Sequence, residues 1–205
     1  MTEKILNAIK ELREKSKKRK FPQSFDLIVS LKEFDTKKVE NRLAEDVFLP
    51  NGRGRDAKVV VFSDTIKDLD CSVLTSEDIN NLVKNKRETK KLVTDTDFFL
   101  AEAKMMPLIG KALGQFLAPR GKMPKIISGD EKALVKNYKK AVRIRIKDSP
   151  VVQCLVGKED MKDEEIAGNI ESVIKFLESK LPKGKHNIAK KLLKLTMGKP
   201  AKIEV

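Results

Sequence analysis

The chain has 205 residues, of which 40% are apolar and 36% are charged, and its formal net charge at pH 7 is +14. The apolar share and the regular apolar spacing exclude a disordered chain, and no apolar run approaches the ~20 residues of a membrane-spanning helix. A charge excess of one sign concentrates polyanions near a protein surface, so we expect nucleic acid as the partner, with an anionic membrane surface as the competing interpretation.

The chain supplies little material for catalysis or metal binding. Cys71 and Cys154 lack the paired spacing of a zinc site or a redox dithiol, and both lie in apolar stretches, which predicts reduced, buried thiols in a cytoplasmic protein. One histidine, His186, is too few for a histidine-based triad or metal cluster. The stretch GRGRDA (52–57) is followed by a strand pattern, whereas a dinucleotide fingerprint needs a helix there. We therefore expect a turn with positive φ at its glycines, no enzyme activity, no metal and no cofactor.

The first third of the chain is expected to contain one helix and three strands. Ile5, Ile9 and Leu12 fall on one helical face after a cap at Thr2, and this helix ends in the basic run KSKKRK. Apolar and polar residues then alternate over 25–31, which predicts a half-buried strand. The segment VFLP ends a second strand, and KVVVF is expected as a third, buried strand.

The middle of the chain alternates short strands with helices. Residues 71–74 predict a strand, Thr75 begins a helix with the capping sequence TSED, and 92–94 are expected as another short strand. Pro107 starts a helix that ends at APRGKMP, and AVRIRIK (141–147) predicts a strand with one apolar and one basic face. Alternating strands and helices indicate an open α/β layer with partly parallel pairing.

The last third is expected to contain a strand at 151–157, a long helix and two final strands. The acids of KEDMKDEE fall where the helix starts, and a helix N-terminus favours negative charge, so no metal is needed to explain them. Leu193 and Leu195 lead into the segment TMGKP at strand spacing, and Ala201 and Ile203 lead out of it at the same spacing. The segment TMGKP therefore predicts a connection between two strands.

Two segments are candidates for binding nucleic acid, and each has an ordinary structural alternative. In KSKKRKF the cations adjoin Phe21, whose ring can pack on a sugar or a base but would equally suit a residue that anchors the next strand to the core. In TMGKP, Thr196 offers a hydroxyl, Met197 a deformable apolar contact and Gly198 a close backbone approach, which together suit a ribose. An ordinary hairpin turn is the alternative there.

Several segments together resemble one protein family. LKLTMGKPAKIEV resembles the end of ribosomal proteins of the L-one family, which belong to the mobile lateral stalk of the large subunit. LAPRGKMPK resembles the mid-chain signature of that family, and the two motifs stand in the family's order. The likeness continues through KFPQSFDLIVSL and LPNGRGR, covers most of the chain, and is stronger to archaeal than to bacterial members.

The resemblance implies an α/β (α+β) fold with two domains. The first domain would be built from both chain termini, residues 1–65 and 151–205, with an antiparallel-rich sheet and helices. Residues 66–150 would form an inserted, open, Rossmann-like α/β domain.

The resemblance also implies a structural RNA-binding protein. Family members bind the stalk region of large-subunit ribosomal RNA mainly through the first domain and take part in the release of tRNA from the exit site, and several repress translation by binding their own messenger RNA. We therefore expect a cytoplasmic component of the large ribosomal subunit that is monomeric when free. Its expected partners are these three RNAs, with no membrane among them.

The binding motifs of the family carry over onto segments near both ends of this chain. The expected RNA-binding residues are Arg19, Lys20, Phe21, Ser24, Lys190, Lys194, Thr196, Met197, Gly198, Lys199 and Pro200. Lys190 stands where many relatives have a serine, so a phosphate contact would replace a hydroxyl contact there. Secondary RNA contacts are expected at Arg53, Arg55, Arg120 and Lys122.

Two other classes of protein stay open at this point. A basic enzyme that acts on nucleic acid would need a metal or a general base, and the sequence supplies no convincing set of residues for either. A general nucleic-acid-binding protein that compacts DNA needs only the net charge, and it would bind duplex DNA as well as it binds structured RNA.

Overall fold

The computed structural model describes residues 2–203 except 18, 37, 39, 40, 67 and 68. The internal contacts of the chain divide it into two compact units, of which Met1–Arg55 with Lys140–Val205 make the first and Asp56–Lys139 make the second. Among the described residues, no helix combines the length and the apolar character needed to cross a membrane.

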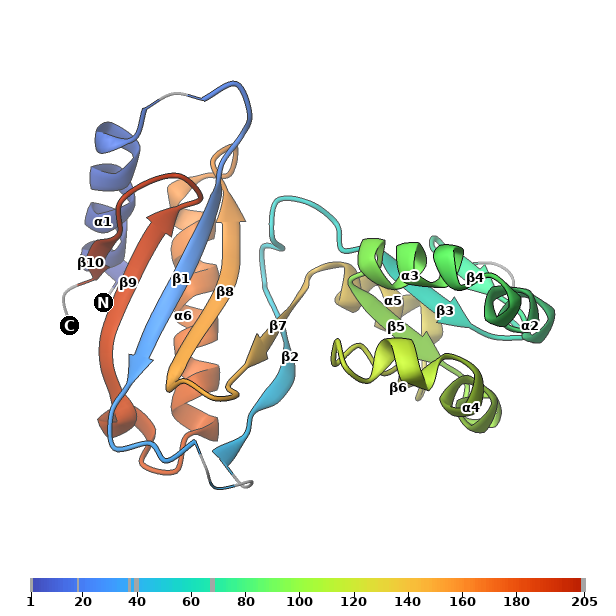
Figure 1. Cartoon of the computed structure of the whole chain (residues 1–205). Coiled ribbons are helices and arrows are strands. Elements are labelled where there is room, and N and C mark those ends of the chain that lie inside the picture. Colours follow the sequence, from blue (N-terminus) through green and yellow to red (C-terminus); the bar gives the residue numbers. More distant parts are fainter. Residues whose placement is uncertain (1, 18, 37, 39–40, 67–68, 204–205) are drawn as a thin grey trace. The chain divides into compact units, whose positions relative to one another are not determined.

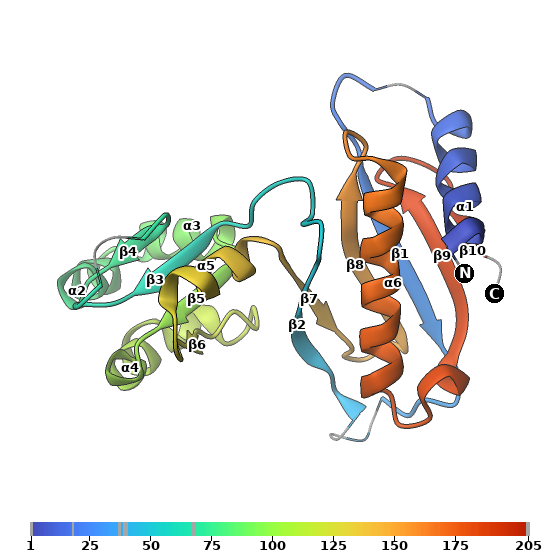
Figure 2. The same ribbon diagram turned by 180° about the vertical axis from the view of Figure 1, so that it is seen from behind.

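The first unit is an antiparallel four-stranded sheet with two long helices on one face (Figures 1 and 2). The strand order is β10-β9-β1-β8, so the sheet joins strands from both ends of the chain. Its elements are α1 (Thr2–Lys15), β1 (Ser24–Leu31), β8 (Val151–Lys158), α6 (Asp163–Lys180), η3 (Gly184–Asn187), β9 (Ile188–Leu195) and β10 (Ala201–Ile203).

Alternation along the strands decides which face of this sheet is buried. Phe25, Leu27 and Val29 of β1 are fully buried, and the residues between them are partly exposed, as the sequence predicts. Ile9 of α1 and Ile170 of α6 belong to the same core cluster, so the two helices cover this face. Among the described residues of the first unit, no helix covers the opposite face (Figure 1).

A two-stranded ribbon also belongs to the first unit. It pairs β2 (Ala44–Phe48) with β7 (Ala141–Arg145) in antiparallel register. Arg143 Nε donates to Asp46 Oδ1 at 2.7 Å across this pair, and the Asp46 side chain is only 2% exposed. Part of the basic face expected for AVRIRIK is therefore used in an internal ion pair.

The second unit is a parallel sheet with helices, in the strand order β4-β3-β5-β6. The parallel pairing and the alternation of strands with helices confirm the predicted α/β class. Its elements are β3 (Val59–Phe62), β4 (Ser72–Leu74), α2 (Ser76–Lys84), α3 (Lys86–Asp95), β5 (Phe98–Ala101), η2 (Ala103–Met105), α4 (Met106–Leu117), β6 (Lys125–Ile126) and α5 (Glu131–Lys139). The predicted cap of α2 is confirmed, because Thr75 N–H donates to Asp78 Oδ2 and Asp78 N–H donates to Thr75 Oγ1.

The strand expected at 92–94 is wrong, because this segment lies inside α3. Asn85 begins that helix by accepting a hydrogen bond from the Glu88 backbone N–H, and Val93 is buried on its inner side. The strand in this region is β5, in which all four residues are buried. A strand that is buried on both faces has no alternation that would mark it in the sequence.

The expected ranges are 1–65 with 151–205 for the first domain and 66–150 for the second. The two compact units have other boundaries, at the strands β3 and β7. β3 pairs with β4 and β5, and therefore the second unit begins at Asp56. β7 pairs with β2, and therefore residues 140–150 pack with the first unit.

Both cysteines are free, as expected, but only Cys154 is buried. Burial raises the pKa of the Cys154 thiol to about 12. Cys71 is partly exposed, so the expectation that both thiols are buried is wrong for this residue, although partial burial still raises its pKa.

Candidate nucleic-acid interface

The TMGKP turn lies against the start of β1. Thr196 N–H donates to the Ser24 carbonyl oxygen at 3.1 Å, and Ser24 N–H donates to Thr196 Oγ1 at 3.1 Å. The Thr196 hydroxyl also donates to the Ser24 carbonyl oxygen at 3.3 Å. The predicted connection between two strands is confirmed, and it places the KFPQS and TMGKP segments side by side although they are about 170 residues apart in sequence.

Gly198 closes this turn. Its N–H donates to the Leu195 carbonyl oxygen at 2.8 Å. A Cβ added at Gly198 would lie 3.3 Å from Leu195 Cβ, so a larger residue would push the turn away from β9. Met197 stands beside it with 62% of its surface exposed, which leaves the thioether free to contact a partner.

Three lysines line the open face of the first-unit sheet. Lys190 and Lys194 lie on β9 and Lys202 on β10, and the alternate residues of β9 are buried on the helix side. In the register of β1 and β9, Lys194 lies opposite Asp26, and Lys190 lies opposite Ser30. We call this face, with its lysines Lys190, Lys194 and Lys202, the outer face.

The centre of the outer face is slightly hollow and carries both apolar and polar side chains. Ile28 and Leu155 are partly exposed there, and with Asp26, Gln153 and Lys194 they line a depression of about 290 Å³. Lys194 can hold a phosphate there while a sugar packs against the side chains of Ile28 and Leu155.

Gln23 holds the TMGKP turn from inside. Its side-chain Oε1 accepts a hydrogen bond from Met197 N–H at 3.3 Å, and the residue is 1% exposed. Glu159 fixes Gln23 in turn, because Gln23 N–H donates to Glu159 Oε2 at 3.1 Å and Glu159 N–H donates to the Gln23 carbonyl oxygen at 2.8 Å. The turn is thus tied to the loop between β8 and α6 as well as to β1.

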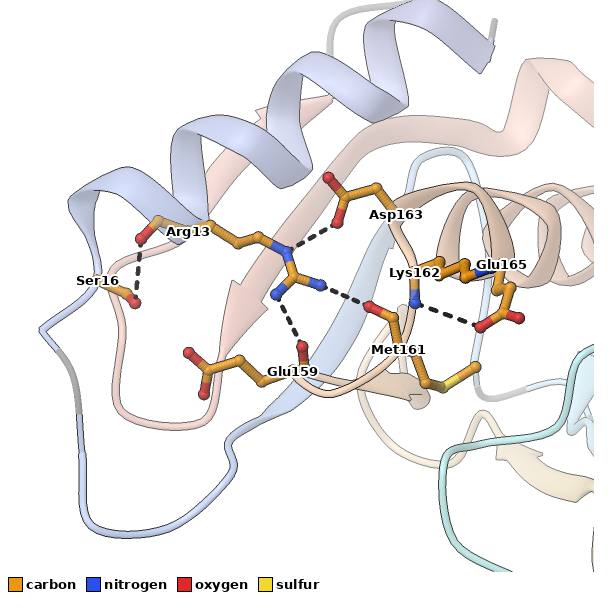
Figure 3. Close-up of polar contacts among 7 residues, drawn as sticks. All are labelled: Arg13, Ser16, Glu159, Met161, Lys162, Asp163 and Glu165. Carbon is orange, nitrogen blue, oxygen red and sulfur yellow. Dashed lines mark hydrogen bonds and ion pairs between the residues drawn. The ribbon is translucent and has the colours of Figure 1, made fainter.

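The guanidinium of Arg13 clamps that same loop to the end of α1 (Figure 3). Its Nε donates to Asp163 Oδ1 at 2.8 Å, and its two Nη atoms donate to the carbonyl oxygens of Glu159 and Met161, each at 2.7 Å. The guanidinium also lies 5.5 Å from the centroid of the Phe25 ring. Of the acids at the start of α6, Asp163 pairs with Arg13, and Glu165 accepts a hydrogen bond from Lys162 N–H at 3.3 Å. Among the described residues, no group of three or more His, Cys, Asp or Glu side chains could hold a metal ion.

Phe21 lies outside the core. Its side chain is 49% exposed, whereas Phe25, four residues later, is fully buried in the core cluster. Phe25 and not Phe21 therefore anchors β1 to the core. Arg19 and Lys20 are exposed beside Phe21, so charge and an aromatic ring are presented together.

One known protein family matches the chain over most of its length. The model of the ribosomal protein L1p/L10e family matches residues 12–199, which is more than nine-tenths of the chain. The chain belongs to this family. It is therefore a structural ribosomal protein and not an enzyme, as the resemblance implies.

Archaeal relatives match over almost the whole chain. The large ribosomal subunit protein uL1 of Methanothermococcus thermolithotrophicus is 44% identical over 98% of this chain and 98% of its own length. The uL1 proteins of Methanocaldococcus jannaschii and Methanothermobacter thermautotrophicus are 44% and 41% identical and are covered over 95% and 97% of their lengths. These matches confirm the predicted resemblance to archaeal members of the family.

The expected secondary contact Arg53 lies in the turn between β2 and β3. Gly52 and Gly54 have φ values of 70° and 78°, as the GRGRDA motif predicts. Arg53 is 9% exposed and its Nε donates to the Arg55 carbonyl oxygen at 3.1 Å, so this arginine stabilises the turn. An RNA contact at Arg53 or Arg55 stays a prediction.

The two other secondary residues, Arg120 and Lys122, lie in the second unit and hold the C-terminus of α3. Arg120 Nη1 donates to Thr94 Oγ1 at 2.6 Å, and Lys122 Nζ donates to the Val93 carbonyl oxygen at 2.8 Å. The last carbonyl groups of a helix lack partners within the helix, and a cation there also interacts favourably with the helix dipole. The PRGK part of the mid-chain signature thus has a structural role, and an RNA contact by these two residues stays a prediction.

Sequence reasoning did not single out four residues that the structure places at this interface: Asp26, Gln153, Lys202 and Gln23. The alternation of the strands already shows that Asp26, Gln153 and Lys202 point away from the core. Only the pairing of β8, β1, β9 and β10 brings them onto one face, and the sequence does not give that pairing.

Replacing Asp26 by asparagine is expected to strengthen RNA binding and to stabilise the first unit near neutral pH. Burial raises the pKa of the Asp26 carboxyl, and the nearby Lys194 opposes this shift only in part. A pKa that is higher in the folded than in the unfolded state makes stability fall as pH rises through the folded value. The free energy of unfolding in urea should therefore be higher for Asp26→Asn than for wild type at pH 7, and this difference should disappear below about pH 4. A variant that is less stable at pH 7 would contradict this assignment.

Proposed function

We propose that this protein is a component of the large ribosomal subunit and binds the stalk region of its ribosomal RNA through the KFPQS and TMGKP segments and the outer face. The observation that carries the proposal is the contact of Thr196 with Ser24, because it joins the two motifs into one continuous surface beside the lysines of β9. The relatives, which are named as large ribosomal subunit proteins, support the same partner.

The chemistry of this surface favours structured RNA over a particular base sequence. Lysines on the outer face suit phosphates, and the exposed backbone around Gly198 suits close approach of a ribose. A 2′-hydroxyl both donates and accepts hydrogen bonds, and it distinguishes RNA from DNA at such a site. Recognition therefore depends on the shape of a folded RNA and on its sugars and phosphates.

Two finer roles extend the proposal. The same surface would bind the protein's own messenger RNA where that messenger folds like the ribosomal site, which would repress translation. The second unit, which carries further exposed cations on α3, would contact tRNA during its release from the exit site. The resemblance to the family is the ground for both roles.

The affinity for a hairpin from the stalk region of large-subunit RNA is expected to fall steeply with salt. Each phosphate neutralised by the protein adds roughly 0.7 to 0.9 to the magnitude of the slope of log affinity against log salt concentration. Replacing Lys190 and Lys194 together by glutamine should reduce that magnitude by about 1.5. Filter binding or fluorescence anisotropy at several salt concentrations measures the slope.

The matched control replaces Lys10 and Lys175, which are exposed on the two helices, by glutamine. It changes net charge equally and should leave the slope near that of the wild type. Equal slopes for both double variants would contradict the outer face as the binding surface. Equal affinity of the wild type for duplex DNA and for the RNA hairpin would favour a general DNA-compacting protein instead.

A further inference from the structure

A groove lies on the first unit between the end of α1 and the TMGKP turn. Its volume is about 530 Å³, and its lining includes Lys15 and Lys17 after α1 and Met197 and Lys199 from the turn. The groove is distinct from the depression on the outer face, which has other lining residues. Both the helix end and the turn are thus available to hold one ligand.

Gln23, one of the lining residues, carries a buried hydrogen-bond donor. The residue lines the groove and is 1% exposed, and its Oε1 is already occupied by Met197 N–H. Its Nε2 is the single buried side-chain nitrogen or oxygen that lacks a hydrogen-bond partner among the residues the structure describes. A buried donor without a partner costs free energy, and native proteins rarely keep one unless a ligand or a water satisfies it.

The charges around the groove select an anion. Among the described residues that line it, four are cations, namely Lys15, Lys17, Arg19 and Lys199, and one, Glu11, is an acid. Glu11 is paired with Lys15 one helical turn away, which neutralises it. An acceptor that carries negative charge therefore fits both the surrounding cations and the donor of Gln23.

We propose that this groove is a subsite for one phosphodiester of a bound RNA strand, with Gln23 Nε2 donating to a phosphate oxygen. The subsite rests on the proposed function, because it takes a phosphate of the RNA that the neighbouring outer face binds. Met197 N–H holds the side-chain amide of Gln23 through its Oε1, and Glu159 holds the Gln23 backbone, so the donor is oriented before the RNA arrives. The proposal makes Gln23 an RNA ligand that also positions the turn.

Two substitutions that remove the Gln23 donor test the subsite. Gln23→Glu keeps the size and the acceptor for Met197 N–H but removes the donor, and Gln23→Met removes both. Each variant should bind the stalk hairpin at least roughly tenfold more weakly than wild type, since a hydrogen bond to a charged group is lost. Gln115→Glu and Gln115→Met are the matched controls, because Gln115 is exposed on α4 of the second unit, and both should bind like wild type.

The outcomes distinguish the subsite from the proposed function. If wild type fails to bind the hairpin at all, the proposed function fails. If wild type binds and both folded Gln23 variants bind equally well, the subsite is overturned while the proposed function stands. Circular dichroism establishes that each variant is folded.

A spectroscopic measurement on the wild-type protein covers the case in which the variants do not fold. The side-chain amide resonances of Gln23 are followed by ¹H–¹⁵N NMR during addition of the hairpin and, separately, of inorganic phosphate. A shift with the hairpin, alone or together with a shift caused by phosphate, supports the subsite. Resonances that stay unchanged at saturating hairpin would overturn it.

Discussion

Replacing Phe21 by alanine is expected to weaken binding of the stalk hairpin by roughly tenfold while leaving the first unit folded. The ring is 49% exposed next to Arg19 and Lys20, so its loss removes an aromatic contact to RNA and little core packing. Stacking of a base on an aromatic side chain contributes about 1–3 kcal/mol by alanine substitution, and 1.4 kcal/mol corresponds to a factor of ten in affinity. Anisotropy titration at fixed salt measures the change.

Phe48 offers a matched control for this experiment. It has the same exposed fraction, 49%, and belongs to the same unit, but it lies on β2 and not at the interface. Phe48→Ala should therefore bind the hairpin like wild type. Unchanged affinity for Phe21→Ala, or an equal loss for both variants, would remove Phe21 from the binding surface.

Replacing Arg13 by alanine is expected to have the largest effect on stability. It would remove hydrogen bonds to the Asp163 carboxylate and to two carbonyl oxygens, and with them the polar link between the end of α1 and the segment that leads into α6. Hydrogen bonds to charged groups contribute about 1.5–3 kcal/mol each, and this group is about 30% exposed, so we expect a loss of roughly 3 kcal/mol in the free energy of unfolding. Urea unfolding followed by far-UV circular dichroism measures it.

The control for Arg13 is Lys10→Ala, which removes an exposed cation from the same helix and should change stability by less than about 0.5 kcal/mol. Arg13→Lys should fall between the two, because an ammonium keeps the charge but cannot reach three acceptors in the same plane. If Arg13→Ala were as stable as Lys10→Ala, the clamp would contribute nothing to the fold. We also expect the Arg13→Ala protein that remains folded to bind RNA more weakly than wild type. The reason is that the clamped loop carries Glu159, which holds the backbone of Gln23.

Much of the first unit could be predicted from the sequence because its periodicities are strong. The alternation from Phe25 to Leu31 gave both the strand and its buried face, and the spacing on either side of TMGKP gave two strands and their connection. These features depend only on local repeat lengths of the chain. They do not show that β1 pairs with β9, and the resemblance to the family implies only that both chain termini build one domain.

The parts that could not be predicted depend on contacts between distant residues. The four buried residues of β5 carry no alternation, and 92–94 lie inside a helix whose start is fixed by Asn85. The role of Gln23 depends on Glu159 and Met197, each more than 130 residues away, and no local pattern indicates it. Arg120 and Lys122 are expected from the sequence to contact RNA, but the structure shows that both side chains donate hydrogen bonds at the C-terminus of α3.

Crosslinking the protein to RNA in living cells and sequencing the attached RNA tests the central claim most directly. That claim is that KFPQS, TMGKP and the outer face together bind one folded ribosomal RNA element. We expect a single dominant cluster of crosslinked reads in the stalk region of large-subunit ribosomal RNA. Reads spread evenly over unrelated transcripts, or none from that region, would contradict it.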